Sequence, residues 1–398
     1  MPGECVRYFF CALCYHDSES ECEANVKNRA IVAGHICIDI TPVFPDNAQK
    51  FCSVSEILKP GKLITTNAPD IHTGGTVANT GLAMKILGAD VKLLGKIGDD
   101  GFGKLVENVL RKFHAEDDLI ISQNSVTSYS VVIAIPGIDR IFLHCPGAND
   151  EFMCSDISDD VLDDAVLFHF GYPPLMRSMF VDDGSELVKI FRRVREREIA
   201  TSLDLAAVDL GSESGRANWG KILADVLPYV DFFVPSFEEL CLMLRREKYD
   251  EIVARANGRD ITEILDFESD IKPLAEICLE LGAKCVLIKC GSPGIYLRTS
   301  GSMNRIGKRL EINHASWNNF SRFERSYKIS QVLSGTGAGD TSIAAFLTSI
   351  LEGFDPSESL QNAAAAGALC CTAYDAISGL KNLREIRAMI DAGWEKNL

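Results

Sequence analysis

The residues best suited to chemistry form a short glycine-rich stretch, "SGTGAGDTS", at positions 334 to 342. One carboxylate, Asp340, follows three glycines and precedes an apolar segment with helical spacing. Amide N–H groups at a helix N-terminus attract an anion, and glycines put no β-carbon in its way. A carboxylate beside a bound phosphoryl group can take a proton from an attacking hydroxyl. The stretch therefore indicates a phosphate cradle with a general base, although Asp340 could also be an ordinary helix cap.

Two other nucleotide-binding patterns fit this sequence poorly. The stretch "GDDGFGKL" (98–105) nearly completes a P-loop, but Leu105 stands where a Ser or Thr would hold Mg²⁺. An apolar side chain cannot bind a hard cation, so a turn from a strand into a helix is the better interpretation. The dinucleotide fingerprint needs two residues before its third glycine, whereas "GTGAG" has one.

The elements that must position the glycine-rich stretch alternate between strands and helices. Apolar runs predict strands at 29–40, 90–98, 165–171, 200–206, 231–236, 285–291 and 327–333. Amphipathic spacing predicts helices at 76–89, 101–113, 184–197, 271–283 and 340–354. This alternation favours an α/β fold, with parallel strands in an open sheet and helices on both faces. A hairpin signal at residues 136–139 does not fit that pattern and indicates a small separate β element.

Composition argues against several classes of partner. The formal net charge of −16 and the pI near 5.0 disfavour nucleic acid and anionic membranes, because the overall field repels both. No apolar run approaches the roughly 18 residues that cross a bilayer. The 14 cysteines mostly lie in apolar stretches, which favours a reducing compartment and a cytoplasmic protein. Residues 1–28 are interpreted as a flexible N-terminal extension. Its weak zinc pattern consists of Cys5, Cys11, Cys14, Cys22 and His16.

Several stretches together resemble one family. "GGTVANTGLAMKILGADVKLLGKIGDDGFG" (74–103) and "SGTGAGD" are similar to the two signatures of the ribokinase-like, PfkB-type carbohydrate kinases. "GHICIDI", "VPSFEEL", "IKCGSPGIYL" and "NAAAAGA" follow the family's order from about residue 29 to the C-terminus. The resemblance implies a three-layer αβα sandwich with a mostly parallel central sheet and a small β-sheet lid. The lid is expected at about 41–73 and 125–150, and surface insertions are expected at about 245–270 and 298–328.

The resemblance also implies roles for individual residues. Asp340 would be the general base for transfer of a phosphoryl group from ATP to a sugar hydroxyl, and Glu239 would organise the water shell of Mg²⁺. The anion hole would consist of the amides of Gly337, Ala338 and Gly339. The implied sugar-binding residues are Asp39, Gly74, Gly75 and Asn79, with Arg140 and Asn149 reaching in from the lid. The implied nucleotide-binding residues are Ser236, Glu239, Lys289, Gly291, Gly294, Thr336 and Asn362.

Ordinary structural roles stay open for several of these positions. Asp39 could form a turn, Asn79 could cap a helix, and Asn362 could lie on a helix surface. Gly291 and Gly294 also fit a hairpin turn. His35 and His169 are the histidines nearest the expected pocket, and a lone histidine beside a strand is usually structural.

Four departures from the family pattern affect the expected substrate. Ser334 replaces an Asp, which puts potassium activation in doubt, and Ser236 replaces an Asn. Cys37 stands where ribokinase-type members carry a sugar-binding Asn, and Thr76 and Val77 replace a Lys-Gly pair, so plain ribose is disfavoured. The expected acceptor is a sugar or sugar acid. One alternative is a nucleoside, with an aromatic platform at Phe170 and Tyr172; the other is a sensor without catalysis. A homodimer formed through the lid is also implied.

Overall fold

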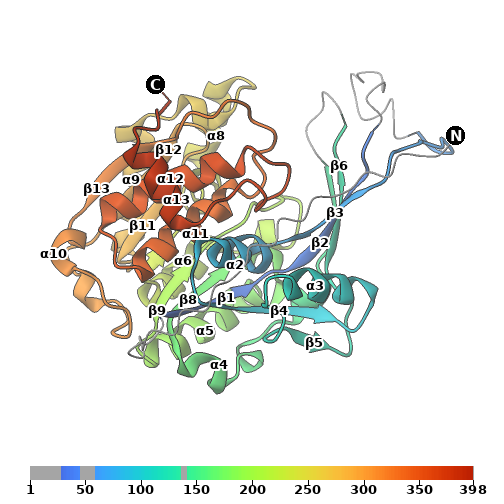
Figure 1. Ribbon diagram of the computed structural model, residues 1–398, viewed down its shortest axis with the longest axis horizontal. Helices are drawn as coiled ribbons and strands as arrows, with labels where there is room; N and C mark the ends of the chain where they lie inside the picture. Colours follow the sequence, from blue (N-terminus) through green and yellow to red (C-terminus); the bar gives the residue numbers. More distant parts are fainter. Residues whose placement is uncertain (1–27, 45–58, 136–140, 398) are drawn as a thin grey trace, which may run out of the picture.

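The computed structural model describes residues 28–44, 59–135 and 141–397 (Figure 1). Arg140, the turn at 136–139 and the N-terminal cysteines therefore lie outside the described residues. Within the described part, the strands form a nine-stranded sheet and a separate four-stranded sheet. No described helix is both long enough and apolar enough to cross a membrane.

The large sheet has the order β13-β12-β11-β10-β9-β8-β1-β4-β5. Pairing is parallel from β5 to β11, and β12 and β13 add to one edge in antiparallel fashion. The strands are β1 (Arg29–Gly34), β4 (Val91–Gly98), β5 (Ile120–Ser122), β8 (Ala165–Gly171), β9 (Ala200–Leu203), β10 (Phe232–Phe233), β11 (Cys285–Lys289), β12 (Gly294–Thr299) and β13 (Ser321–Arg325).

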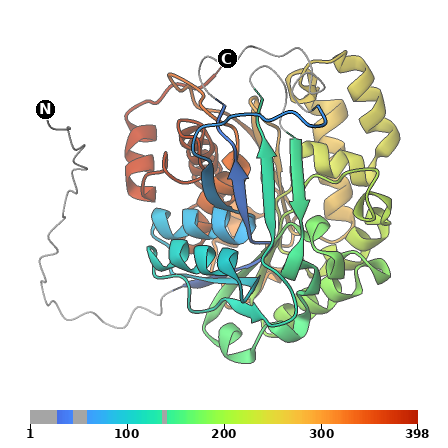
Figure 2. The ribbon, with the colours of Figure 1, turned by 90° about the vertical axis from the view of Figure 1, so that its right-hand side faces the viewer.

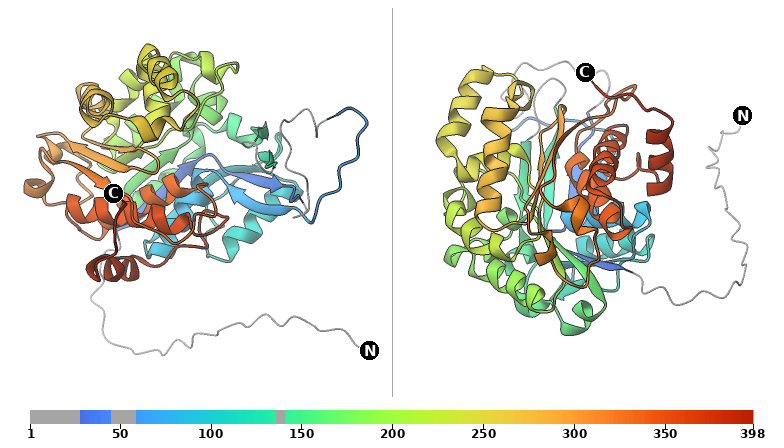
Figure 3. Two further views of the ribbon diagram at one scale, coloured as in Figure 1. Left: turned by 90° about the horizontal axis from the view of Figure 1, so that it is seen from above. Right: turned by 90° about the vertical axis from the view of Figure 1, so that its left-hand side faces the viewer.

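Helices cover both faces of this sheet, as Figure 3 shows from two sides. One face carries α2 (Thr76–Leu87), α3 (Gly101–Arg111), α11 (Ala338–Leu351), α12 (Pro356–Cys370) and α13 (Leu383–Asp391). The other carries α5 (Ser185–Glu196), α6 (Trp219–Val226), α7 (Phe237–Leu244), α8 (Arg246–Ala256) and α9 (Lys272–Glu280), together with the short α4 (Asp159–Asp163). The helix α10 (His314–Trp317) lies between β12 and β13 in the chain.

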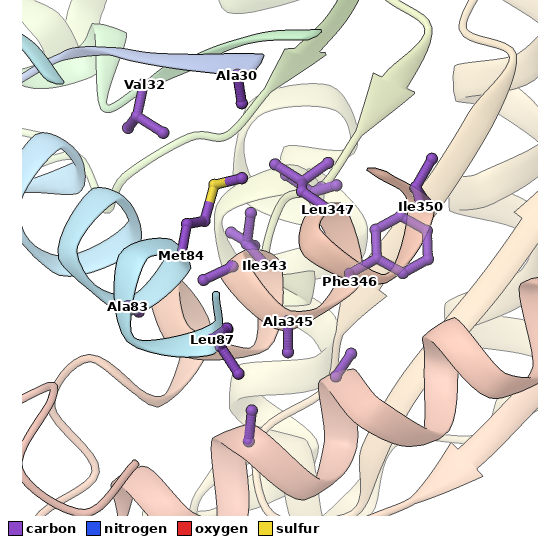
Figure 4. Packing of buried hydrophobic residues seen from close by; sticks show 14 of the residues in the cluster. Ala30, Val32, Ala83, Met84, Leu87, Ile343, Ala345, Phe346, Leu347 and Ile350 are labelled. Carbon is purple, nitrogen blue, oxygen red and sulfur yellow. The ribbon is translucent and has the colours of Figure 1, made fainter. Parts of the chain in front are cut away.

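The alternation of side chains in β1 explains why both faces are covered. Ala30 and Val32 belong to the core on the α2–α11 side, whereas Ile31 and Ala33 belong to the core on the other side. In Figure 4, Met84 of α2 points toward Ile343 of α11 beneath the strand. This packing fixes the helix that begins with the glycine-rich stretch against the helix that follows the double glycine.

The small sheet forms the predicted lid and faces the viewer in Figure 2. Its order is β3-β2-β6-β7, with β3 (Asp70–Gly74) and β7 (Ile141–Cys145) at the edges. The inner strands β2 (Cys37–Thr41) and β6 (Tyr129–Ile133) pair in parallel. The antiparallel pair β6–β7 is the hairpin that the sequence predicts.

Two strand predictions are wrong. The single strand expected at 29–40 is two strands, β1 and β2, which belong to different sheets. The strand β1 ends at Gly34, whose φ of 125° is readily adopted only by glycine. Gly34 also packs closely on Gly171: a β-carbon on Gly34 would lie 2.3 Å from the Gly171 carbonyl oxygen. The strand expected at 327–333 does not form: apart from an isolated bridge from Tyr327 to Lys396, the segment is irregular.

The two polar segments expected as surface insertions are ordered. Residues 245–270 contain α8 and place Ile252 and Asp270 in buried positions. Residues 298–328 contain α10 and the edge strand β13, and Trp317 is fully buried there. Both segments therefore add to the core as well as to the surface.

Candidate active site

Two cavities meet at the loop before α11. The lid cavity, of about 640 Å³, is lined by Asp39, His72 and Phe142 of the lid and by Asn79 of α2. The turn cavity, of about 570 Å³, is lined by the turn between β11 and β12 and by the residues that begin α11. Gly335 lines both cavities, so this loop separates them.

Asp340 lies in the wall between the two cavities. Its side chain lines the turn cavity, and its Oδ2 accepts a hydrogen bond of 3.1 Å from Asn79, which lines the lid cavity. Thr80 donates to Oδ1 at 3.2 Å, and the Tyr172 hydroxyl lies 2.8 Å from Oδ1 and 2.7 Å from Oδ2. Burial raises the pKa of Asp340 above its usual value, although Lys289 opposes this effect. A base with a raised pKa accepts a proton more readily near neutral pH.

The start of α11 exposes main-chain donors to the turn cavity. Gly337 is the N-terminal cap, with φ 79° and ψ −4°, and a β-carbon at this position would lie 2.3 Å from that of Ala376. Only glycine fits such a position without strain. The N–H of Ala338 points back to the carbonyl of Gly335 at 3.3 Å, so this predicted anion-hole amide is partly engaged. The first amides of a helix otherwise lack intrahelical partners and suit an anion.

A buried ion pair supplies positive charge at this helix start. The Lys289 ammonium at the end of β11 lies 2.8 Å from Asp204 Oδ1, and both side chains are largely buried. A β-carbon on Gly339 would lie 3.6 Å from Lys289 Nζ, so the ammonium is beside the first turn of α11. The carboxylate of Asp204 raises the pKa of Lys289 against the effect of burial, which keeps the ammonium charged.

Ser236 and Glu239, which are expected from the sequence on the nucleotide side, also line the turn cavity. They form a capping box at α7: Ser236 Oγ accepts the Glu239 N–H at 3.4 Å, and Glu239 Oε2 accepts the Ser236 N–H at 3.0 Å. No group of three or more His, Cys, Asp or Glu among the described residues could hold a metal ion. A magnesium ion in this cavity would therefore take most of its ligands from phosphate and water.

The predicted sugar side of the site centres on Asp39 in β2. Its Oδ1 lies 3.5 Å from Cys37 Sγ, and burial raises its pKa. A β-carbon on Gly74 would lie 2.2 Å from Asp39 Oδ2, so glycine allows this close approach. Gly75 caps α2 with φ 84°. Asn79 does not cap that helix, since it lies in its interior and donates to Asp340.

The two histidines near the site differ. His169 is satisfied, with Ser202 Oγ 2.9 Å from one ring nitrogen and Thr76 Oγ1 3.4 Å from the other. His35 is equally buried, but neither of its ring nitrogens has a hydrogen-bond partner among the described residues. Its ring centroid lies 6.1 Å from that of Tyr172. Burial lowers the pKa of His35 to about 3, so the ring is neutral at ordinary pH.

Four sequence expectations do not match the observed positions. Asn149 is fully buried outside both cavities, where its amide holds the main chain of Ile36 by bonds of 2.9 Å and 3.2 Å. Asn362 faces α11 and donates to Ser349 Oγ at 3.0 Å, away from the turn cavity. Thr336, expected to bind the nucleotide, lines the lid cavity and does not line the turn cavity. Phe170 packs in the core against other phenylalanines and forms no platform.

The sequence motifs identify neither Asp204 nor Thr80 as residues of the site. Tyr172 is expected from the sequence only as part of an aromatic platform, not as a partner of Asp340. Asp204 and Tyr172 directly follow β9 and β8, at the carboxyl ends of parallel strands. Polar residues at these strand ends are a recognisable signal, because ligands in open α/β sheets bind there. Thr80 gave no signal, since a threonine inside an apolar helix is compatible with simple packing.

Comparisons with known proteins agree with this architecture. The model of the pfkB family carbohydrate kinase matches residues 32–383. Ribokinase of Arabidopsis thaliana is 25% identical over 351 residues, which cover 86% of this chain and 79% of that protein. Fructokinase-1 of Zea mays is 24% identical over 340 residues, covering 80% and 88%. The 2-dehydro-3-deoxygluconokinase of Thermoproteus tenax is 24% identical over 340 residues, covering 84% and 90%.

Solved structures show the same fold. Arabidopsis thaliana ribokinase complexed with ribose and ATP superposes with a TM-score of 0.69 at 22% identity, covering 92% of this chain and 99% of that one. A putative ribokinase II from E. coli in complex with ATP and Mg²⁺ gives a TM-score of 0.66 at 21% identity, with the same coverage. The predicted ribokinase-like sandwich and lid are confirmed. Because the family model spans most of the sequence, the chain belongs to the pfkB family of carbohydrate kinases.

Proposed function

We propose that this carbohydrate kinase transfers the γ-phosphoryl group of ATP to a hydroxyl of a sugar or sugar acid, with Asp340 as general base. The observation that carries the proposal is the position of Asp340 between two cavities of similar size. The lid cavity presents Asp39 and other lid residues to a polyol. The turn cavity presents main-chain amides and the Lys289 ammonium to phosphates.

The acceptor binds in the lid cavity, where Asp39 accepts hydrogen bonds from its hydroxyl groups and Asn79 donates to them. Asp340 removes the proton of the reacting hydroxyl as its oxygen attacks the terminal phosphorus. The raised pKa of Asp340 suits this task, because the proton must move to the carboxylate and later leave it.

The turn cavity binds the triphosphate. Amides at Gly337 and Gly339 donate to the transferred group, and the Lys289 ammonium beside them offsets its developing negative charge. Asp204 holds that ammonium in place and keeps it charged. A magnesium ion would neutralise charge between the phosphates, with Glu239 in its water shell.

A nucleoside acceptor is the second candidate. Phe113, Phe142 and Tyr374 line the lid cavity, and flat aromatic side chains can stack on a base. Phe170, the platform residue suggested by the sequence, is buried elsewhere and does not contribute.

The test is an ADP-release assay with Mg–ATP and a panel of D-ribose, D-fructose, 2-dehydro-3-deoxygluconate and a purine nucleoside. The proposal expects turnover with a sugar or sugar acid, and loss of this turnover in Asp340→Asn. The matched control is Asp225→Asn, a half-exposed carboxylate that pairs with Lys221 on the surface. Tight binding of a panel member without ADP release would support a sensor instead. Turnover with the nucleoside alone would support the second candidate.

A further inference from the structure

The Tyr172 hydroxyl contacts both carboxylate oxygens of Asp340, the proposed base. Its hydroxyl lies 2.8 Å from Asp340 Oδ1 and 2.7 Å from Oδ2, so a single O–H group spans both acceptor atoms. Burial and the carboxylate of Asp340 raise the pKa of Tyr172 well above its usual value. The hydroxyl therefore keeps its proton and donates it to the carboxylate.

The main chain at Tyr172 is restrained, which leaves its side chain as the part that can move. The residue lies in the left-handed region, with φ 65° and ψ 39°, which is uncommon for a non-glycine residue. It is followed by two buried prolines, Pro173 and Pro174, which restrict the chain. A residue held in such a conformation at a strand end indicates a functional constraint.

The other two donors to Asp340 cannot give way easily. Thr80 and Asn79 belong to α2, which packs in the core against α11, and Thr80 is fully buried. Tyr172 and Asn79 are both partly buried, Tyr172 against the turn cavity and Asn79 against the lid cavity, but Tyr172 does not belong to α2. An acceptor hydroxyl that gives its proton to Asp340 needs a lone pair on the same oxygens. Asn79 and Thr80 each contact one oxygen, whereas the Tyr172 hydroxyl contacts both, so the donor that gives way is the Tyr172 hydroxyl.

We propose that Tyr172 guards the catalytic base: its hydroxyl occupies both carboxylate oxygens of Asp340 and excludes water from them until the acceptor hydroxyl displaces it. The inference rests on the proposed function. Without a guard, water can attack the terminal phosphorus while Asp340 takes its proton, which breaks the bond to ADP and releases inorganic phosphate. The guard thus prevents loss of ATP to hydrolysis and favours acceptors that compete well for the base.

The experiment measures ATP hydrolysis without any acceptor, using the full chain and Mg–ATP. Tyr172→Phe retains the ring and removes the hydroxyl, and Tyr172→Leu removes both. In each variant, phosphate release is expected to rise at least tenfold over wild type. The rise must vanish when Asp340→Asn is added, because water then has no base. The matched control is Tyr296→Phe, which also removes a tyrosine hydroxyl bond, to Ser321 at 2.9 Å, but touches no group at Asp340.

The outcomes separate this inference from the proposed function. If Tyr172→Phe and Tyr172→Leu are folded, as judged by thermal unfolding, and hydrolyse ATP at or below the wild-type rate, the guard role is wrong. A rise that persists with Asp340→Asn also overturns it. The proposed function fails separately if Asp340→Asn alone phosphorylates the acceptors of the panel at the wild-type rate. A rise in the Tyr296→Phe control would show that any lost hydroxyl has this effect, and would equally refute the guard.

Discussion

Replacing Asp340 with Asn should nearly abolish turnover, and the stability of the variant relative to the wild type should increase as the pH rises. The two side chains have almost the same shape, so the wall between the cavities stays in place. Loss of a general base typically reduces the rate by about 10² to 10⁴, which corresponds to about 3–5 kcal/mol of transition-state stabilisation. ATP binding should be nearly unchanged, because the turn cavity keeps its amides and Lys289.

The hydrogen bonds around Asp340 determine the structural cost of this change. Asparagine offers one carbonyl oxygen, which can accept from Asn79 and Tyr172 at the position of Oδ2. Its NH₂ group then faces Thr80, whose hydroxyl can rotate and accept where it formerly donated. The net cost is therefore about 1 kcal/mol or less, the usual contribution of a single hydrogen bond.

The pH dependence has a definite sign. Burial raises the pKa of Asp340 in the folded protein above the value of 3.8 for a free side chain. As the pH rises between these two values, the unfolded chain releases its proton first, so the stability of the wild type falls and remains lower above the folded pKa. Asparagine does not titrate. The free energy of unfolding of Asp340→Asn, minus that of the wild type, should increase through this range and then level off.

Urea unfolding at several pH values between 4 and 8 measures this difference, and ADP release measures turnover. The Asp225→Asn variant should match the wild type in both, because its carboxylate is solvated. A stability difference that shrinks as the pH rises would refute the burial argument. Wild-type turnover in Asp340→Asn would refute its assignment as the base.

Three further changes test the surrounding structure. Gly337→Ala should cost about 1–2 kcal/mol for its left-handed backbone, and should lower turnover by about 10² because the loop must shift; wild-type turnover would contradict this. Lys289→Met should destabilise the fold by about 3–5 kcal/mol by leaving Asp204 unpaired. Adding Asp204→Asn should restore thermal stability but not turnover, and recovery of both would show a purely structural pair. Asn149→Ala should lower stability by about 1–3 kcal/mol and raise KM for the acceptor, because Asn149 holds the main chain of Ile36, which leads into the lid. An unchanged melting temperature would refute this role of Asn149.

The sequence alone determined the features that depend on neighbours within a few turns of the chain. Apolar periodicity correctly indicated β4, β8, β11 and the helices α2 and α11, because each element must bury one face or stripe. The glycines before Asp340 indicated a helix start open to an anion, since only glycine tolerates the backbone found at Gly337. The family signatures then gave the order of the whole sandwich.

Only the tertiary structure decided which polar groups face the cavities and which satisfy the chain itself. Asn149 and Asn362 have side chains as suited to a ligand as that of Asn79, but the fold engages them with Ile36 and Ser349. The partners that shape the site lie far apart in sequence: Lys289 and Asp204 are 85 residues apart, and Asp340 and Tyr172 are 168 residues apart. Local preferences carry no information about such pairs, because their contact exists only once separate strands and helices are packed together.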